Sequence, residues 1–284
     1  VWIKRKDMQF TNHNRYLNIL ACNCQQLSMN LIFPFSLNKY LTVLILFVAS
    51  PGWAETTLVQ NRQILENAIS IQTSIFGPVQ VQLVDNKTSK ILFENILKGP
   101  GTFTVRDLPS SSVNNLTLIS IPGQPSQIIE FTYQLPFSEY ADWSISQGFH
   151  GEASHSDSLN TYAVDFDISF GTLVLAARTG VVMEVIDTFP DNGKHQKSNL
   201  ENANTIRILH EDGSMAVYGH LLQDSALVKP GQWLVGGTVI AQSGNSGFTN
   251  GSHLHFSIQV NTGMHLESIP FQMKSVNGYL QLNP

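Results

Sequence analysis

The chain has 284 residues, of which 42% are hydrophobic and 13% are charged. That balance can bury a core and argues against an intrinsically disordered chain. The length suits one large domain or two modest ones. Phe, Tyr and Trp make up 10% of the residues, and much of the chain alternates between apolar and polar positions, so an all-β fold is expected.

The first 54 residues have the layout of a secretory signal peptide. An apolar run over residues 41–49 follows Lys39 and is too short to cross a bilayer as a helix. Gly52-Trp53-Ala54 then places small residues at the two positions that signal peptidase reads. We therefore expect a signal peptide over residues 29–54, cleaved after Ala54, and an upstream extension over residues 1–28.

Removal of this segment would leave a mature chain without cysteine, since Cys22 and Cys24 both lie within it. Such a chain can form no disulfide, and any metal site in it must use nitrogen and oxygen ligands. Its 11 basic and 20 acidic residues give a net charge of −9, which argues against a nucleic-acid partner. We expect an exported protein with no stable membrane span once the signal is removed.

Residues 55–136 are expected to form a small β-sandwich. The segment 79–84 alternates cleanly and places Val79, Val81 and Leu83 on one face of a strand. Turn clusters rich in Gly, Pro, Asn, Asp and Ser separate it from further candidate strands, over residues 68–75, 90–97, 101–105, 115–121 and 128–135. Six strands at this spacing suggest a sandwich. No catalytic constellation lies among them, so a packing or targeting role is expected.

Residues 137–284 are expected to form a second domain, also built of strands, in which His, Gly and Asp are concentrated. The boundary between the two domains is expected at Leu135-Pro136-Phe137. No long amphipathic helix, heptad pattern or internal repeat is found beyond it. The residues that could carry chemistry fall in three stretches of this second domain.

The strongest signal is a Gly-rich turn followed by an alternating strand. His253 and His255 share one face of this strand, while Leu254 and Phe256 point to the core. Two imidazoles on one strand face are costly unless they hydrogen-bond or bind a metal. The pair by itself leaves a structural role and a metal site about equally open.

The second signal is a carboxylate within an alternating strand. Tyr162, Val164 and Phe166 form the apolar face of this strand, and Asp165 lies on the opposite face. A carboxylate placed there needs a partner, and a cation is a natural one. An ordinary exposed strand face is the other interpretation. His155 lies ten residues upstream, across a polar loop, and could fold back beside Asp165.

The third signal is His220, which follows a turn marked by Asp212-Gly213 between two strands. The alternation would place His220 on the same strand face as Ala216 and Tyr218. Taken alone, such a histidine is more often part of a core or a surface than a catalyst.

In this order, the three stretches resemble the M23 family of zinc metallopeptidases, the lysostaphin/LytM-type endopeptidases of peptidoglycan. The resemblance covers about residues 147–260, and the ordered set is specific although each motif alone is weak. The matching stretches are Ser154-His155 with Tyr162-Ala-Val-Asp165-Phe, Gly171 to Val182, Asn204 through Tyr218-Gly-His220-Leu, and Gly244-Asn-Ser-Gly247 through His253-Leu-His255-Phe. The resemblance implies an antiparallel-sheet, LytM-like domain with an open groove.

The resemblance also implies the roles of five residues. His155, Asp165 and His255 would bind one zinc ion per chain, and His220 and His253 would be the catalytic histidines. Two His and one Asp leave one tetrahedral position open for water, as catalytic zinc requires. His253 is the expected base, and His220 is expected to bond the oxyanion or position the water. The division between these two histidines stays open.

The first ligand departs from the spacing of many family members, which place it four residues before the aspartate. Ten residues separate His155 from Asp165, as in a branch of the family with a longer loop. His150 is the competing candidate, within Gly148-Phe-His150-Gly. In the family that stretch resembles a Gly-rich approach to the site, so we expect His155 to be the ligand.

The implied function is hydrolysis of a peptide bond in peptidoglycan cross-links or stem peptides, in the periplasm or outside a bacterial cell. The main alternative is a non-catalytic LytM-like module that binds the cell wall and activates other hydrolases. Such relatives typically lack part of the His/Asp set, whereas all five positions are present in this chain. A general protease is a further alternative. The bond that is cut and the oligomeric state stay open.

Overall fold

The computed structural model describes most of the chain from residue 61 onward. The described stretches are residues 41–42, 61–65, 68–112, 115–126, 129–193 and 202–283. Every regular element in them is a β-strand, so the predicted all-β fold is confirmed. Apart from Leu41–Thr42, the expected signal segment over residues 29–54 lies outside the described residues.

All the described residues belong to one compact unit of the chain. A search of the described residues for a helix long and apolar enough to cross a membrane finds none.

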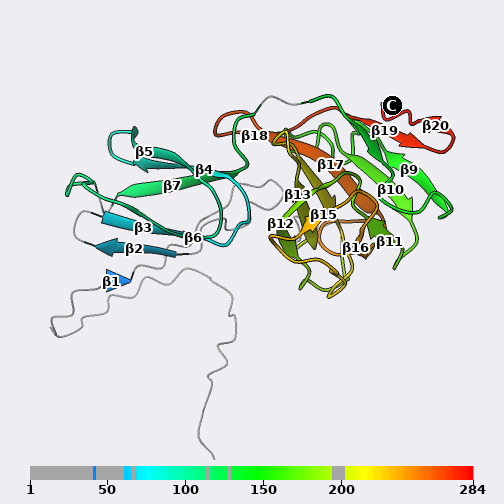
Figure 1. The fold of residues 1–284 in the computed structure, drawn as a ribbon, viewed down its shortest axis with the longest axis horizontal. Helices are drawn as coiled ribbons and strands as arrows, with labels where there is room; N and C mark the ends of the chain where they lie inside the picture. The colour runs from blue at the N-terminus through cyan, green and yellow to red at the C-terminus, as the bar shows by residue number, and fades with distance from the viewer. Residues whose placement is uncertain are drawn as a thin grey trace, which may run out of the picture. The chain divides into compact units, whose positions relative to one another are not determined.

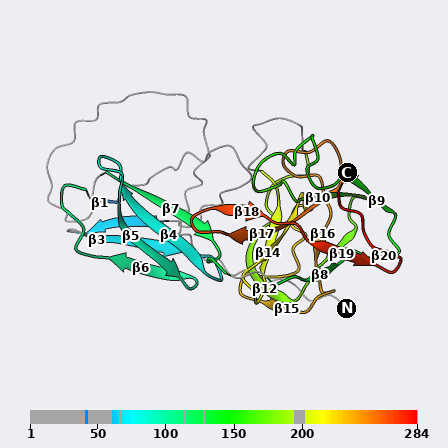
Figure 2. The ribbon, with the colours of Figure 1, turned by 90° about the horizontal axis from the view of Figure 1, so that it is seen from above.

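Two antiparallel sheets near the start of the described chain pack face to face (Figure 1), and their strands overlap in the view from above (Figure 2). The strand orders are β1-β2-β3-β6 and β5-β4-β7. The strands are β1 Leu41–Thr42, β2 Asn61–Leu65, β3 Ala68–Thr73, β4 Val79–Asp85, β5 Lys90–Leu97, β6 Gly101–Val105 and β7 Leu116–Pro122. Buried Ile, Val and Leu side chains from the two sheets form one core.

The alternation read from the sequence explains how β4 lies in this core. Val79, Val81 and Leu83 are fully buried, as predicted. The residues between them face the other way, and the amides of Gln80 and Gln82 each donate to the carboxylate of Glu94 on β5, at 3.0 Å. The period of two therefore separates core packing from cross-strand hydrogen bonding.

The last strand predicted for the sandwich belongs to another sheet. β8 (Thr132–Gln134) pairs in parallel with β19 (Gln272–Ser275), which pairs with β20 (Gly278–Tyr279). The assignment of residues 128–135 to the sandwich is therefore wrong. Tyr133 of β8 is buried against Phe271, with ring centroids 5.7 Å apart. Burial of these two aromatic rings stabilises the pairing of segments that are far apart in the sequence, and local periodicity does not reveal such a pairing.

A larger antiparallel sheet positions the site residues. Its strand order is β15-β12-β13-β14-β17-β10-β9, with β18 paired to β17. The strands are β9 Trp143–Gln147, β10 Val164–Ile168, β12 Gly180–Ile186, β13 Thr205–Leu209, β14 Met215–Gly219, β15 Trp233–Leu234, β17 Leu254–Asn261 and β18 Leu266–Ser268. A separate two-stranded sheet joins β11 (Leu173–Leu175) to β16 (Val239–Gln242).

Strand β17 lies in the interior of this sheet, between β14 and β10, and all eight of its residues are buried. Leu254 and Phe256 pack into the core, as the alternation predicted. His255 is the direct partner of Asp165 on β10 and of Gly219 on β14. Direct partners have Cβ atoms about 4.5–5.5 Å apart, so the register of three strands sets where the site forms.

A buried ion pair lies beside the turn between β13 and β14. Arg178 Nη1 is 3.0 Å from Asp212 Oδ2, and the two side chains are 5% and 0% exposed. Arg178 also donates to the phenol oxygen of Tyr133, and its guanidinium lies 4.1 Å from the ring centroid of Phe131. The hydroxyl and backbone N–H of Ser214 donate to Asp212. The buried carboxylate is therefore fully paired.

His210 is buried next to this pair. Its Nδ1 donates to the carbonyl of Thr179 at 2.9 Å, and its Nε2 is buried without a hydrogen-bond partner. Burial, together with the nearby charge of Arg178, lowers the pKa of His210 from 6.5 to about 4. His210 is therefore neutral at pH 7.

Candidate metal centre

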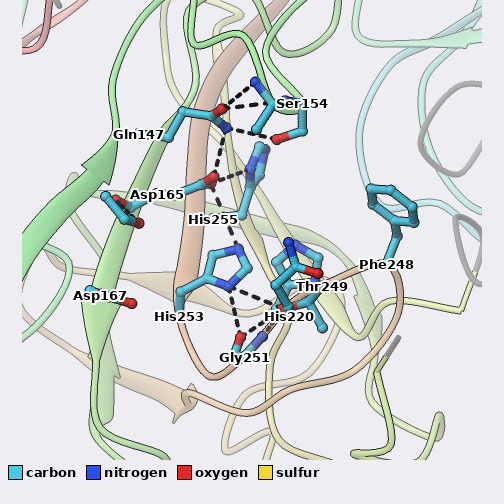
Figure 3. A pocket seen from close by; sticks show the side chains of 13 residues that line it. Gln147, Ser154, Asp165, Asp167, His220, Phe248, Thr249, Gly251, His253 and His255 are labelled. Carbon is cyan, nitrogen blue, oxygen red and sulfur yellow. Dashed lines mark hydrogen bonds and ion pairs between the residues drawn. The ribbon is translucent and has the colours of Figure 1, made fainter. Parts of the chain in front are cut away.

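His155, Asp165 and His255 lie together and are all buried, and each offers a ligand atom within 4.8 Å of the others. His255 Nδ1 is 2.9 Å from Asp165 Oδ1, and Figure 3 shows these two side chains meeting. His155 Nε2 is 3.3 Å from the same carboxylate oxygen. One oxygen and two ring nitrogens from distant parts of the chain therefore converge on one point.

The orientation of His155 shows that this point suits a cation. Its Nδ1 lies 2.8 Å from the carbonyl of Gly148, so Nδ1 is the donor and Nε2 carries the lone pair of the neutral ring. Nε2 is buried and has no hydrogen-bond partner. A nitrogen lone pair facing the oxygen of Asp165 is repulsive unless a proton or a metal lies between them. The donor set, two His nitrogens and one carboxylate, fits zinc.

Asp165 and His255 have the charge states that metal binding requires. Burial opposes the charge of Asp165, but the adjacent imidazoles of His155 and His255 outweigh it and hold the Asp165 pKa well below its usual range. Burial lowers the pKa of His255. Burial also opposes protonation of His155, but the adjacent Asp165 carboxylate raises the His155 pKa overall. A metal at His155 Nε2 would compete with a proton for the same lone pair, so metal binding should be pH-dependent.

His253 stands next to the three converging residues. It directly precedes β17, and its side chain is 16% exposed. Its Nδ1 lies 3.0 Å from the carbonyl of Gly251 and 3.2 Å from the hydroxyl of Thr249 (Figure 3). The Nε2 atom lies 3.8 Å from Asp165 Oδ1. The ring is therefore fixed at one nitrogen and turns the other toward the candidate metal position.

His220 reaches the site by a turn that the alternation did not predict. Ala216 and Tyr218 pack into the core, so the prediction that His220 shares their face is wrong. At His220 the backbone φ is +59°, which turns the chain after β14. The ring then lies 4.5 Å from the ring of His253, between centroids. A left-handed non-Gly residue costs about 1–2 kcal/mol, and such strain is common at functional sites.

Burial keeps His220 neutral. Its Nδ1 donates to the carbonyl of Ser246 at 2.7 Å. Burial, reinforced by the nearby His253 and His255, holds the pKa of His220 well below its usual range. With Nδ1 committed as a donor, the neutral ring presents Nε2 as a hydrogen-bond acceptor.

His150, the competing first ligand, lies apart from the three converging residues. It is exposed, and its ring packs edge-on against Tyr162 at 5.0 Å. The backbone N–H of His150 donates to the carbonyl of Thr161. The structure therefore brings His155, and not His150, to Asp165 and His255.

A pocket of about 300 Å³ opens onto these residues. Asp165, His220, His253 and His255 form part of its wall, together with Gln147, which the sequence reasoning did not single out. Figure 3 shows Gln147 pointing at Asp165 from β9. The sequence held no signal for it, since nothing local indicates that β9 pairs with β10.

A model of peptidase family M23 matches residues 160–267. The chain carries an M23 domain. The matched residues include Asp165, His220, His253 and His255, and they begin after His155. M23 proteins are zinc metallopeptidases, and the donor set of His155, Asp165 and His255 is one that zinc accepts.

Two curated proteins are similar to this chain over about a third of its length. An uncharacterized metalloprotease from Haemophilus influenzae is 35% identical over 98 residues, 34% of this chain and 18% of the relative. Lysostaphin from Staphylococcus staphylolyticus is 32% identical over 102 residues, 36% of this chain and 19% of lysostaphin. The chain thus spans less than a fifth of the length of these relatives.

Solved structures of similar proteins also align with parts of the chain. The antimicrobial peptidase lysostaphin from Staphylococcus simulans is 26% identical, with a TM-score of 0.32, over 43% of this chain and 44% of that one. A zinc-containing peptidase from Vibrio cholerae is 19% identical, with a TM-score of 0.35, over 71% of this chain and 54% of that one.

Proposed function

We propose that this chain is a zinc-dependent endopeptidase that hydrolyses peptide bonds in peptidoglycan cross-links or stem peptides. The observation that carries the proposal is the convergence of His155, Asp165 and His255 beside a pocket that holds two more histidines. The M23 match supports the peptidase chemistry. The similarity to lysostaphin, described in a solved structure as an antimicrobial peptidase, supports a cell-wall substrate.

One zinc ion per chain would be held by His155 through Nε2, by Asp165 through Oδ1 and by His255 through Nδ1. Three protein ligands leave a fourth tetrahedral position open, which distinguishes a catalytic zinc site from a structural one. A bound zinc ion polarises a carbonyl group and lowers the pKa of water to about 7.

His253 is the residue placed to accept the proton of the attacking water. The Gly251 carbonyl holds its Nδ1–H, so the neutral ring directs the lone pair of Nε2 toward the candidate metal position. The side chain of His253 is also partly exposed, so the proton could pass on to solvent or to the leaving amine. Both features suit a general base that later acts as an acid.

His220 is suited to orienting the water. Donation to a developing oxyanion would need a proton on Nε2, but Nδ1 already carries the proton of the neutral ring. Its lowered pKa disfavours a second proton. We therefore assign His220 as a hydrogen-bond acceptor for water, which separates its role from that of His253.

The proposed substrate also requires export of the protein. Peptidoglycan lies outside the cytoplasmic membrane, so the enzyme would work in the periplasm or at the cell exterior. The signal peptide expected over residues 29–54 would provide that route.

Zinc analysis combined with hydrolysis of labelled sacculi tests this function. Asp165→Ala should lose both zinc and activity. His253→Ala should retain zinc while its turnover falls about 10²–10⁴-fold, because a positioned base is lost. His265→Ala, at an exposed histidine, is the matched control and should behave like wild type.

Three outcomes would contradict parts of the proposal. Loss of zinc in His253→Ala would make that residue a ligand. A wild-type protein that binds zinc and sacculi but does not cut the sacculi would favour the non-catalytic module. Cleavage of casein as rapid as that of sacculi would favour a general protease.

A further inference from the structure

The side-chain amide of Gln147, at the end of β9, joins Asp165 to the loop that precedes His155. Its Nε2 donates to Asp165 Oδ2 at 2.9 Å and to the hydroxyl of Ser154 at 2.7 Å. Its Oε1 accepts the backbone N–H of Ala153 at 2.9 Å and that of Ser154 at 3.3 Å. Figure 3 shows the amide between the loop and the carboxylate.

These contacts fix which way the amide faces. Two backbone N–H groups can only donate, so they require the oxygen of Gln147 on the loop side. The nitrogen must then face Asp165. Two donated and two accepted hydrogen bonds use the full capacity of a primary amide, which leaves Gln147 one orientation.

The glycine at position 151 allows this close approach. A Cβ atom added to Gly151 would lie 2.1 Å from Cγ and 2.6 Å from Cδ of Gln147, well inside contact distance. The loop therefore packs directly on the Gln147 side chain. His155 follows immediately, and its backbone N–H donates to the carbonyl of Gly151 at 3.0 Å.

The two oxygens of Asp165 consequently have different partners. Oδ1 faces the imidazoles of His155 and His255, whereas Oδ2 is occupied by the amide of Gln147. A carboxylate held in this way offers one oxygen to a metal. With two oxygens free, it could bind in a bidentate manner and fill the position that catalysis needs for water.

We propose that Gln147 is a positioning residue of the metal site. It restricts Asp165 to one ligand oxygen, and it anchors the loop that presents His155. The inference rests on the proposed zinc site and adds a residue outside the ligand set. Outer hydrogen-bond partners of metal ligands typically contribute about 10–100-fold in metal affinity.

Gln147→Met tests the proposal, because it keeps the length of the side chain and removes all four hydrogen bonds. Zinc affinity of the full-length protein, measured by chelator competition, should fall about 10–100-fold. In the cobalt-substituted protein, visible absorption should weaken, since release of Asp165 Oδ2 raises the coordination number. Gln134→Met, at an exposed glutamine on β8, is the matched control and should change neither readout.

Gln147→Glu is the second variant, in case the methionine variant fails to fold. As a carboxylate it still accepts the N–H groups of Ala153 and Ser154, but it cannot donate to Asp165. Its loop should stay anchored while its cobalt absorption weakens. This outcome supports a direct effect on the ligand oxygen.

Unchanged zinc affinity and an unchanged cobalt spectrum in a folded Gln147→Met would overturn the proposal. A lower thermal midpoint of the metal-free protein with an unchanged cobalt spectrum would also overturn it, because Gln147 would then be merely structural. If wild type binds zinc without cutting sacculi, the proposed hydrolase fails while the role of Gln147 is still decided by zinc affinity. If wild type binds no zinc, both proposals fail.

Discussion

Replacing His210 by Asn should remove a large part of the acid sensitivity of the fold. The pKa of His210 is about 4 in the folded chain, against 6.5 for an unperturbed histidine such as that of the unfolded chain. Between these two pH values the unfolded chain binds a proton that the folded chain does not. The stability that the folded chain has from keeping His210 neutral is therefore complete above pH 6.5. It is lost as the pH falls toward 4.

The magnitude follows from this difference in pKa. Each pKa unit corresponds to about 1.36 kcal/mol, so the full loss is about 3 kcal/mol. Most of that loss falls between about pH 6.5 and pH 4.5. A single domain is stable by about 5–15 kcal/mol, so one buried histidine would account for a substantial fraction. The physical cause is the buried Nε2, which would have no acceptor for a second proton.

Urea unfolding of the metal-free protein at about pH 7.5, 5.5 and 4.5 measures this effect. Asparagine cannot titrate, and its amide can still donate to the carbonyl of Thr179. Loss of packing against Tyr133 lowers the free energy of unfolding of His210→Asn by the same amount at every pH. It does not change how steeply that free energy depends on pH. Other titrating groups, including Asp165, contribute equally to the pH dependence of both proteins, so their contributions cancel in the comparison. If the free energy of unfolding depends on pH equally steeply in wild type and in His210→Asn, then His210 is not a source of the acid sensitivity.

Three further outcomes are expected. Arg178→Met should lower the free energy of unfolding by about 3–5 kcal/mol, because the buried Asp212 carboxylate loses its counter-charge. Adding Asp212→Asn should recover part of this stability. No recovery in denaturant titrations would contradict the ion pair. His220→Gly should be more stable than His220→Ala by about 1 kcal/mol, because the backbone at this position is left-handed and favours glycine. The usual order is the reverse. Equal denaturation midpoints would argue against a left-handed conformation at residue 220. Zinc at about 100 times its Kd should raise the free energy of unfolding by about 2.7 kcal/mol, and calorimetry should show no such gain in Asp165→Asn.

Local alternation allowed the burial of several strands to be predicted. It placed Val79, Val81 and Leu83 inside the sandwich core. It also separated His255 from its buried neighbours Leu254 and Phe256. The period of two is a property of the strand itself, so it can be read without knowing which strands become neighbours.

The remaining features depend on long-range pairing or on the backbone of a single residue. Gln147 contacts Asp165 because β9 pairs with β10, and the sequence near Gln147 does not encode that partner. β8 likewise joins β19, although many residues separate them. His220 leaves the alternation because its φ is positive, which side-chain pattern alone cannot indicate.

The pairing of Asp165 with His255 makes the candidate metal site sensitive to strand alignment during folding. A slip of one residue between β10 and β17 would place Leu254 or Phe256 opposite Asp165 and turn every side chain of the slipped strand to the other face. No misaligned sheet could then assemble the three donor atoms. Zinc present during refolding would bind only correctly aligned molecules, so it would draw the population away from misfolded and aggregation-prone forms.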